Sequence, residues 1–334
     1  MPLVSIIVPC YNEQATIRLL LESLLRQTVP ARDLEVIIAD GLSTDRTREE
    51  VAAFQQEHPG LLVRLIDNPR RIIPAALNCA LDAAQGKIII RLDAHSVPAE
   101  DYIQRCIEGL DQTGAENVGG VWEIRPFGEG IIAKAVAAAA AHPFGVGDAR
   151  YRYASSAGFV DTVPFGAFRR EVFDRFGKFD EALLTNEDYE FNARLRQKGG
   201  RVWLDPRIRS IYFARPDLPS LSRQYWRYGF WKWRMLRNYP RTLRWRQALP
   251  PVFVLSLAAL LIAALFWRPA GLLLAFEILS YLLVLAAGSL PAARRQRDAR
   301  FILFVPLAIA VMHISWGAGF LWSVLTDIFK ISKK

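Results

Sequence analysis

The first hundred residues alternate short, continuously apolar runs with longer segments in which apolar side chains recur every three or four positions. Continuous apolar runs are typical of strands covered by helices on both faces, and the longer spacing is typical of amphipathic helices. The expected strands are residues 3–8, 34–39, 61–66 and 87–92, and the helices between them are residues 14–27, 46–56 and 74–84. This alternation predicts an α/β fold with a parallel sheet and right-handed crossovers.

Local sequence signals predict where the helices begin and which elements follow residue 116. Asn12, and Ser43 or Thr44, are expected as N-caps of the first two helices, and Pro74 suits the first position of the third. Beyond residue 116 the less regular pattern predicts a strand over 118–124, an Ala-rich helix over 130–141, and short helices over 171–176 and 187–197. We interpret this half as an extension of the same domain that shapes a substrate site.

Three later runs, residues 248–267, 270–290 and 301–325, are almost uncharged. Each has about 20 residues or more, which is enough to cross roughly 30 Å of hydrocarbon. This pattern excludes a wholly soluble, fibrous or disordered protein. We therefore expect a folded domain over 1–218, a separate segment over 219–247 and a transmembrane region over 248–334.

The segment before the first span is basic and aromatic. Residues 222–247 contain eight Arg or Lys and no acidic residue, and Trp226, Phe230 and Trp233 share one helical face at i, i+4 and i+7. An amphipathic helix at the membrane interface has this composition, with guanidinium groups reaching lipid phosphates. A basic aromatic stretch is also compatible with nucleic-acid binding. Because an apolar span follows directly, we expect membrane lipids and no nucleic acid as the partner.

Basic residues near the spans predict the topology, since they favour the cytosolic side. The segment 222–247 and the Arg-rich loop at 294–300 are then cytosolic, and Arg268 marks a short outer turn. Glu277 and His313 are ionisable residues at membrane depth. With one of each, we interpret them as packing or headgroup contacts rather than as a proton pathway.

The third apolar run conflicts with this rule. A full third crossing would place a basic tail outside; its lysines are Lys330, Lys333 and Lys334. Either the tail violates the rule, or the run turns back at Pro306 or at Gly317 and Gly319. We favour a re-entrant or broken segment.

Charge and cysteine content narrow the function classes. The formal net charge of +9 and the pI near 9.6 point to an anionic partner. The chain has three cysteines at irregular spacing, Cys10, Cys79 and Cys106, without a paired C-x-x-C. Neither a disulfide framework nor a thiolate zinc site is indicated, and we expect a reduced, cytosol-facing domain.

Polar residues follow the expected strands at their carboxyl ends, where sheets of this kind bind ligands. Asp40 opens the turn Asp40-Gly41-Leu42-Ser43-Thr44-Asp45, in which a carboxylate can accept from the ring N–H of a base; an ordinary capped turn uses the same residues equally well. Asp93-Ala94-His95 follows the fourth strand. Alternate residues of an extended segment point the same way, so Asp93 and His95 can face one divalent ion, and Mn²⁺ suits this oxygen and nitrogen mixture better than Mg²⁺.

Two further groups have both a structural and a functional interpretation. Glu187 and Asp188 begin an expected helix, where the dipole alone favours carboxylates; the functional alternative is a general base that takes a proton from a hydroxyl. Gln224, Arg227 and Tyr228 lie at i, i+3 and i+4 on one helical face, suited either to a diphosphate and a sugar or to the interfacial stripe.

The order of these motifs resembles the family 2 glycosyltransferases, which have the GT-A fold, over residues 3 to about 230. The matching motifs are Val4-Ser5-Ile6-Ile7-Val8-Pro9-Cys10-Tyr11-Asn12-Glu13, the Asp40 to Asp45 turn, Asp93-Ala94-His95, Glu187-Asp188 and Gln224-x-x-Arg227-Tyr228. The tail around Trp316-Gly317-Ala318-Gly319 is similar to that of membrane-bound bacterial members of the succinoglycan glucosyltransferase type, which extend lipid-linked exopolysaccharide repeats.

The resemblance implies a role for each matched residue. Pro9, Tyr11, Glu13 and Asp40 would hold the nucleotide, with Asp40 reading uracil. Asp93 would contact the donor and, with His95 in place of the second acid of the usual D-x-D, bind Mn²⁺ or Mg²⁺. Glu187 would lie beside the substrates, and Asp188 would be the base of an inverting displacement. Tyr228 replaces the Trp of the family's Q-x-x-R-W pattern, and Leu77 replaces a frequent Arg; the sequence departs from the family at both positions.

From this resemblance we expect transfer of a sugar, glucose in the first instance, from a UDP-sugar to a polyprenyl-diphosphate-linked saccharide. The enzyme would lie in the bacterial inner membrane with several passes and a cytoplasmic catalytic domain. Direct transfer to polyprenyl phosphate and processive polymer synthesis are alternative enzymatic functions. A non-catalytic scaffold of a polysaccharide assembly complex is the alternative outside catalysis.

Overall fold

The computed structural model describes residues 2–147 and 149–329. They form two compact units, the first comprising the chain up to residue 123 together with 150–212, and the second comprising 124–149 together with the chain from residue 213. The expected division into a catalytic domain, an interfacial segment and a transmembrane region, with boundaries at residues 218 and 247, stays a prediction.

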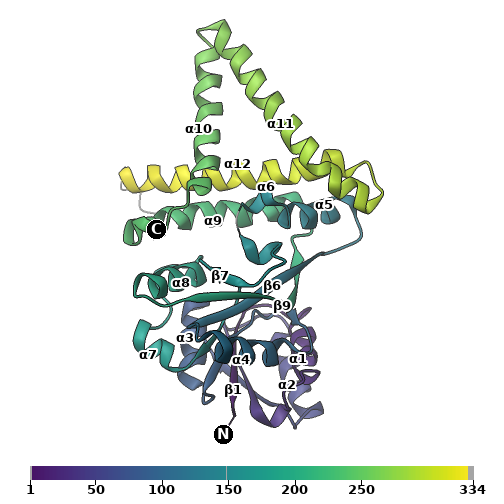
Figure 1. Cartoon of the computed structure of the whole chain (residues 1–334), viewed down its shortest axis with the longest axis vertical. Coiled ribbons are helices and arrows are strands. Elements are labelled where there is room, and N and C mark those ends of the chain that lie inside the picture. Colours follow the sequence, from purple (N-terminus) through teal and green to yellow (C-terminus); the bar gives the residue numbers. More distant parts are fainter. Residues whose placement is uncertain (1, 148, 330–334) are drawn as a thin grey trace. The chain divides into compact units, whose positions relative to one another are not determined.

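The first unit is built on a mixed sheet (Figure 1). Its strands lie in the order β3-β2-β1-β4-β8-β6-β9-β5, with β7 also paired to β9. Four strands are parallel, as predicted, and the rest run antiparallel. The parallel strands are β1 (Val4–Cys10), β2 (Leu34–Asp40), β3 (Leu62–Asp67) and β4 (Ile88–Arg91). The others are β5 (Ser96–Pro98), β6 (Asn117–Pro126), β7 (Gly158–Val160), β8 (Ala167–Arg169) and β9 (Val202–Ala214).

Helices cover both faces of this sheet, which explains why its central strands are continuously apolar. Val4, Ile6 and Val8 of β1 pack in one core with three helices, α1 (Ile17–Leu25), α2 (Thr47–Glu57) and α4 (Tyr102–Thr113). Ile7 points to the other face, into a core with α3 (Ile73–Ala83), α7 (Glu171–Phe176) and α8 (Glu187–Gln197). The three predicted strand and helix repeats are therefore confirmed.

The predicted N-caps of the first two helices are wrong. α1 begins after Thr16 and α2 after Arg46, without a side-chain cap in either case. Asn12 instead bonds across to the other loop: its N–H donates to Ser43 Oγ (2.8 Å), and its Oδ1 accepts from the Thr44 N–H (2.8 Å). The polar residues that usually cap helices here join the loops after β1 and β2.

A close backbone approach between β6 and β9 gives a stability prediction. A Cβ atom added to Gly120 would lie 1.8 Å from the carbonyl oxygen of Ile208, so one strand must shift. We expect Gly120→Ala to lower the unfolding free energy by about 1–3 kcal/mol or more, measured as a lower thermal midpoint in detergent. Gly60→Ala is the control, because its Cβ would meet no atom within 4 Å. Equal midpoints for the two variants would contradict the prediction.

The second unit is helical. Its helices are α5 (Ile131–Ala140), α6 (Pro143–Val146), α9 (Leu218–Asn238), α10 (Trp245–Ala264), α11 (Arg268–Gln296) and α12 (Phe301–Ile328). The last three are long and apolar enough to cross a membrane. The basic segment is interrupted, because α9 ends at Asn238 and α10 begins only at Trp245.

The predicted break in the third apolar run is wrong. α12 continues from Phe301 to Ile328 with Pro306 inside it, and Gly317 and Gly319 lie in its continuous part. These glycines serve close packing: a Cβ on Gly317 would lie 2.4 Å from the Pro250 carbonyl oxygen, and one on Gly319 would lie 2.3 Å from that of Trp226. The lysines of the tail, Lys330, Lys333 and Lys334, lie outside the described residues.

Candidate active site

The expected site residues of the first unit follow the carboxyl ends of β1, β2 and β4. These strands are parallel neighbours, so their carboxyl ends share one edge of the sheet. Cys10 stands opposite Asp40, and Ile7 stands opposite Arg91. The loops that leave this edge carry Glu13 and the turn after Asp40, and the segment after β4 carries Asp93 and His95.

Asp40 holds the turn that follows it. Its completely buried carboxylate accepts from the Ser43 hydroxyl (2.5 Å), the Ser43 N–H (3.0 Å) and Arg48 Nη1 (2.9 Å). The same Arg48 nitrogen donates to Asp67 Oδ1 (2.8 Å), because Asp67 stands opposite Asp40 on β3. The capped-turn interpretation thus describes the structure as it stands, and a contact of Asp40 with uracil stays a prediction.

The end of β1 presents an aromatic ring rather than a reactive thiol. Tyr11 is 49% exposed, and its ring would lie 3.2 Å from a Cβ on Gly41, so the glycine lets the ring rest on the backbone of the turn. Pro9 is half-buried at the end of the strand. Burial, reinforced by the carboxylates of Glu13 and Asp40, raises the pKa of Cys10 far above its usual range. Cys10 is therefore a neutral packing residue.

Glu13 and His95 meet although they are far apart in sequence. His95 Nδ1 lies 2.9 Å from Glu13 Oε1. A carboxylate accepts, so Nδ1 donates, and a neutral imidazole then carries its lone pair on Nε2. The main chain of Glu13 is fixed as well, because its N–H donates to Thr47 Oγ1 (2.7 Å). A histidine whose second nitrogen donates to a carboxylate is the usual arrangement of a metal ligand.

A buried arginine, which the sequence analysis did not identify, joins the two acidic motifs. Arg91 ends β4 with its side chain only 5% exposed, and its Nη2 donates to Glu187 Oε1 (2.8 Å) and to Asp93 Oδ1 (3.2 Å). Its Nε and Nη1 are buried without a hydrogen-bond partner among the residues that the structure describes. The available signal was a charged residue at the end of the apolar run Ile88-Ile89-Ile90.

Glu187 and Asp188 occupy the first turn of α8, after Asn186 in the left-handed conformation (φ 70°). Burial raises the pKa of Glu187 to about 7, against the lowering effect of Arg91. Asp188 is half-buried, and its Oδ1 accepts from the N–H of Tyr189 (2.7 Å). Its charge acts on both Glu187 and Arg91, so it belongs to the same electrostatic cluster.

The donor set fits a divalent ion shared with a substrate. Among residues 2–147 and 149–329, no group of three or more His, Cys, Asp or Glu side chains is placed to hold a metal. Mg²⁺ sites of nucleotide enzymes commonly use one or two protein ligands and take the rest from phosphates and water, and Mn²⁺ accepts the same kinds of oxygen ligand. Asp93 and His95, with His95 oriented by Glu13, match that requirement.

The other predicted residues lie in the second unit. Gln224, Arg227 and Tyr228 are on α9, and Gln224 Nε2 donates to the Tyr228 hydroxyl (2.9 Å), as their i, i+4 spacing predicts. Arg227 is exposed. Whether these three serve the same reaction as Asp188 stays a prediction.

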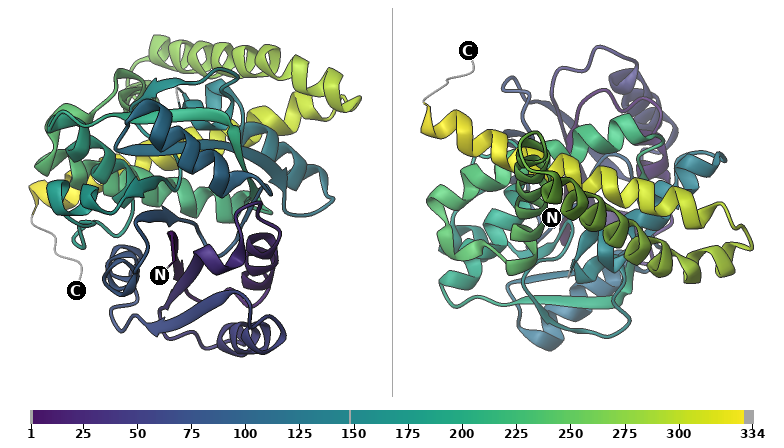
Figure 2. Two further views of the ribbon diagram at one scale, coloured as in Figure 1. Left: turned by 60° about the horizontal axis from the view of Figure 1, so that its bottom comes forward. Right: turned by 90° about the horizontal axis from the view of Figure 1, so that it is seen from above.

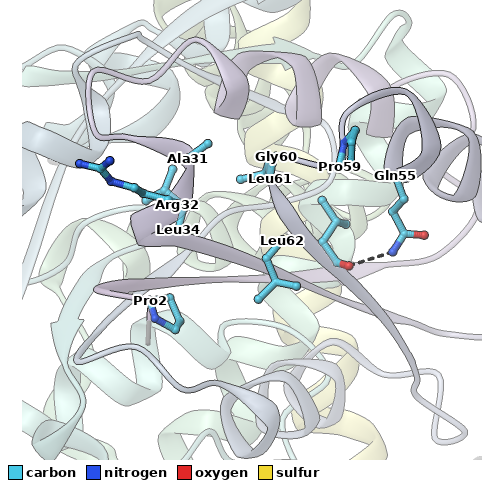
Figure 3. A pocket seen from close by; sticks show the side chains of 10 residues that line it. Pro2, Ala31, Arg32, Leu34, Gln55, Pro59, Gly60, Leu61 and Leu62 are labelled. Atoms are coloured by element: carbon cyan, nitrogen blue, oxygen red, sulfur yellow. Dashed lines mark hydrogen bonds between the residues drawn. The ribbon is translucent and has the colours of Figure 1, made fainter.

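A surface hollow of about 410 Å³ lies away from these groups (Figure 3). It is lined at the start of β2 and β3 by residues that include Arg32, Leu34, Gln55, Gly60 and Leu62. The starts of parallel strands form the edge opposite to their carboxyl ends. Its lining contains no acidic or histidine side chain, and so none of the chemistry described above.

Comparison with known proteins agrees with these observations. The sequence model of the family described as Glycosyl transferase family 2 matches residues 5–177. Succinoglycan biosynthesis protein ExoA of Rhizobium meliloti is 33% identical over 327 residues, which are 96% of this chain and 94% of that protein. Dolichyl N-acetyl-alpha-D-glucosaminyl phosphate 3-beta-D-2,3-diacetamido-2,3-dideoxy-beta-D-glucuronosyltransferase of Methanococcus voltae is 26% identical over 96% of both chains.

A solved structure has the same fold. The mannosyltransferase PcManGT from Pyrobaculum calidifontis, in complex with GDP-Man and Mn²⁺, superposes with a TM-score of 0.61 over 99% of this chain and 88% of that chain, at 24% identity. The GT-A fold expected from the sequence is thereby confirmed, followed by apolar C-terminal helices that could span a membrane.

Proposed function

The chain belongs to glycosyltransferase family 2, and we propose that it transfers a sugar, glucose in the first instance, from a UDP-sugar to a hydroxyl of a polyprenyl-diphosphate-linked saccharide. One observation carries this proposal above the others. Arg91 draws Asp93 and Glu187, from opposite halves of the unit, to one edge of the sheet, and Asp188 follows Glu187. This cluster supports a site at which the donor and a carboxylate base meet at one edge of the sheet.

The donor would lie across the carboxyl ends of β1, β2 and β4. Tyr11, exposed beside the turn, offers a ring on which a base can stack, and Pro9 and Glu13 flank it. Asp40 would fix the turn and use its remaining lone pair on uracil. Asp93 and His95 would hold Mn²⁺ or Mg²⁺, which when bound neutralises negative charge on the diphosphate.

Asp188 would act as general base. It accepts the proton of the acceptor hydroxyl while that oxygen bonds to C1 of the sugar. The bond between C1 and the phosphate oxygen breaks, and UDP leaves with its electron pair. Attack opposite the leaving group inverts the configuration at C1. Glu187, beside the substrates, would keep Asp188 oriented through its bond to Arg91.

The acceptor and the location are also proposals. The names of the relatives from Rhizobium meliloti and Methanococcus voltae, a succinoglycan biosynthesis protein and a dolichyl-linked sugar transferase, support a lipid-linked saccharide. Gln224, Arg227 and Tyr228 on α9 would contact its diphosphate. The protein would be a multi-pass protein of the bacterial inner membrane with its catalytic domain in the cytoplasm, consistent with three long apolar helices.

Sugar transfer by the purified protein tests the proposal. We expect turnover of a UDP-sugar, but not of GDP-mannose, only with a lipid-linked saccharide present, and loss of turnover in EDTA that Mn²⁺ or Mg²⁺ reverses. A product made from polyprenyl phosphate alone would instead identify a polyprenyl-phosphate transferase, and polymer from donor alone a processive synthase. No turnover across a panel of UDP- and GDP-sugars and both acceptors would favour the scaffold.

A further inference from the structure

The third apolar helix lies lengthwise along α9, the basic helix. The Ser222 and Ser315 hydroxyls are 2.8 Å apart, and Arg237 Nη1 donates to Asp327 Oδ1 (2.6 Å) further along both helices. Between these points the backbones touch, since a Cβ on Gly229 would lie 2.0 Å from the Trp316 carbonyl oxygen. On α12 the two side-chain contacts are 12 residues apart, or about 18 Å of helix. The helices are therefore parallel neighbours (Figure 1).

α9 cannot follow α12 into hydrocarbon. Its buried stripe comprises Leu221, Tyr225, Gly229, Lys232 and Leu236. The opposite stripe contains Arg223, Arg227 and Arg234, which are exposed. A crossing α12 would carry these guanidinium groups to bilayer depth, where arginine is among the most unfavourable residues. Packing against α9 thus opposes a third crossing.

The other two apolar helices, α10 and α11, are much less buried within the unit than α12. α10 and α11 form a hairpin with few buried residues, 6% and 11% of their apolar parts, as helices surrounded by lipid would have, whereas half of the apolar part of α12 is buried. The hairpin runs across α12: the right-hand view of Figure 2 shows α12 along its length and α10 nearly end-on. If the hairpin crosses the bilayer, α12 lies in the membrane plane.

The exposed face of α12 suits that position. Five of its seven exposed large apolar side chains form one stripe at i, i+4, i+11, i+22 and i+25, namely Leu303, Leu307, Ile314, Leu325 and Ile328. Ile302 and Trp322 flank this stripe on either side. The opposite side of α12 packs on the other helices of the unit, and Ser315 and Asp327 bond to α9 there, so the exposed stripe is the side that can face acyl chains. The α10–α11 hairpin lies next to α12 (Figure 1), so a hairpin that crosses the bilayer would bring this stripe to the same hydrocarbon.

We propose that α12 lies flat on the cytosolic face of the membrane, with this stripe toward the acyl chains, and that only α10 and α11 cross. Both ends of the chain are then on one side. This topology also satisfies the distribution of basic residues, because Lys330, Lys333 and Lys334 follow α12 and remain cytosolic. It requires no break at Pro306 or at the glycines.

Depth measurements on spin labels test the proposal in the full chain. Cysteines replace residues of the stripe one at a time in a Cys79→Ser background, with Leu303→Cys, Ile314→Cys and Leu325→Cys. Oxygen and nickel-complex accessibility then gives each depth in vesicles. Leu303 and Leu325 are about 33 Å apart along the helix; we expect all three labels within a few Å of one depth. The control pair Leu272→Cys and Leu283→Cys on α11 should differ by roughly 10 Å or more.

A second measurement determines on which side of the membrane a given residue lies. A cysteine appended after Lys334 should resist a membrane-impermeant maleimide in intact spheroplasts and react after lysis, whereas Trp267→Cys at the hairpin turn should react in both. A deep label at Ile314 between two shallow ones, or a tail cysteine labelled in intact spheroplasts, would overturn the proposal. Neither measurement depends on sugar transfer, so the proposed topology can fail while the proposed function holds, and the reverse.

Discussion

Asp188→Asn is expected to lower kcat by about 10²–10⁴-fold, because an amide cannot take the proton of the acceptor hydroxyl. The substitution preserves shape, and the side-chain oxygen can still accept from the Tyr189 N–H. UDP binding, measured by calorimetry with Mn²⁺, should change little. Asp82→Asn is the matched control, since that carboxylate is exposed and forms an ion pair with Lys178 on the surface.

The pattern across the two variants decides the assignment. A kcat for Asp188→Asn within a few-fold of the parent, with transfer still dependent on the acceptor, would mean that another group is the base. Equal losses in kcat and in UDP affinity would point to a binding role for Asp188 instead.

Arg91→Met is expected to damage both stability and catalysis. The substitution leaves the buried Glu187 carboxylate without its cation, and removal of one partner from a buried pair costs about 3–5 kcal/mol. Asp93 also loses a contact that fixes it, so the apparent Mn²⁺ affinity should fall several-fold. Thermal midpoint and manganese binding, followed by electron paramagnetic resonance, measure the two effects.

Two further variants separate the electrostatic effect from simple loss of packing. Arg18→Met removes a surface arginine bonded to Glu22 and Glu57, and should lower the thermal midpoint far less than Arg91→Met. Arg91→Met combined with Glu187→Met removes both charges, and should recover stability without recovering activity. Unchanged manganese affinity in Arg91→Met would show that Arg91 does not position Asp93.

The elements that the sequence predicted well are those with strong local periodicity. β1, β2 and β4 are almost entirely buried and are only four to seven residues long, which suits strands better than helices. β9 was missed because Pro206, Arg207 and Arg209 interrupt its apolar pattern, while its neighbours in the sheet supply the pairing. α12 was expected to break at residues that disfavour helices locally. Its glycines instead meet other helices, which no local pattern reveals.

The site shows the same division. The loops after β1, β2 and β4 could be placed near one another, since parallel strands carry their following residues to one edge. Arg91 and Arg48 could not be recognised, because their partners become apparent only in the fold: Glu187 lies 96 residues from Arg91, and Asp67 neighbours Asp40 through strand register. The bond between Glu13 and His95 likewise depends on how two loops meet.

A structure of the protein with UDP and Mn²⁺ tests the central claim most directly. The account predicts the uracil beside Tyr11 and the turn after Asp40, the diphosphate and the ion at Asp93 and His95, and the Asp188 carboxylate facing the open side of the diphosphate. UDP bound elsewhere, as in the hollow beside Arg32 and Gly60, would contradict it. So would an Asp188 side chain turned away from the bound nucleotide.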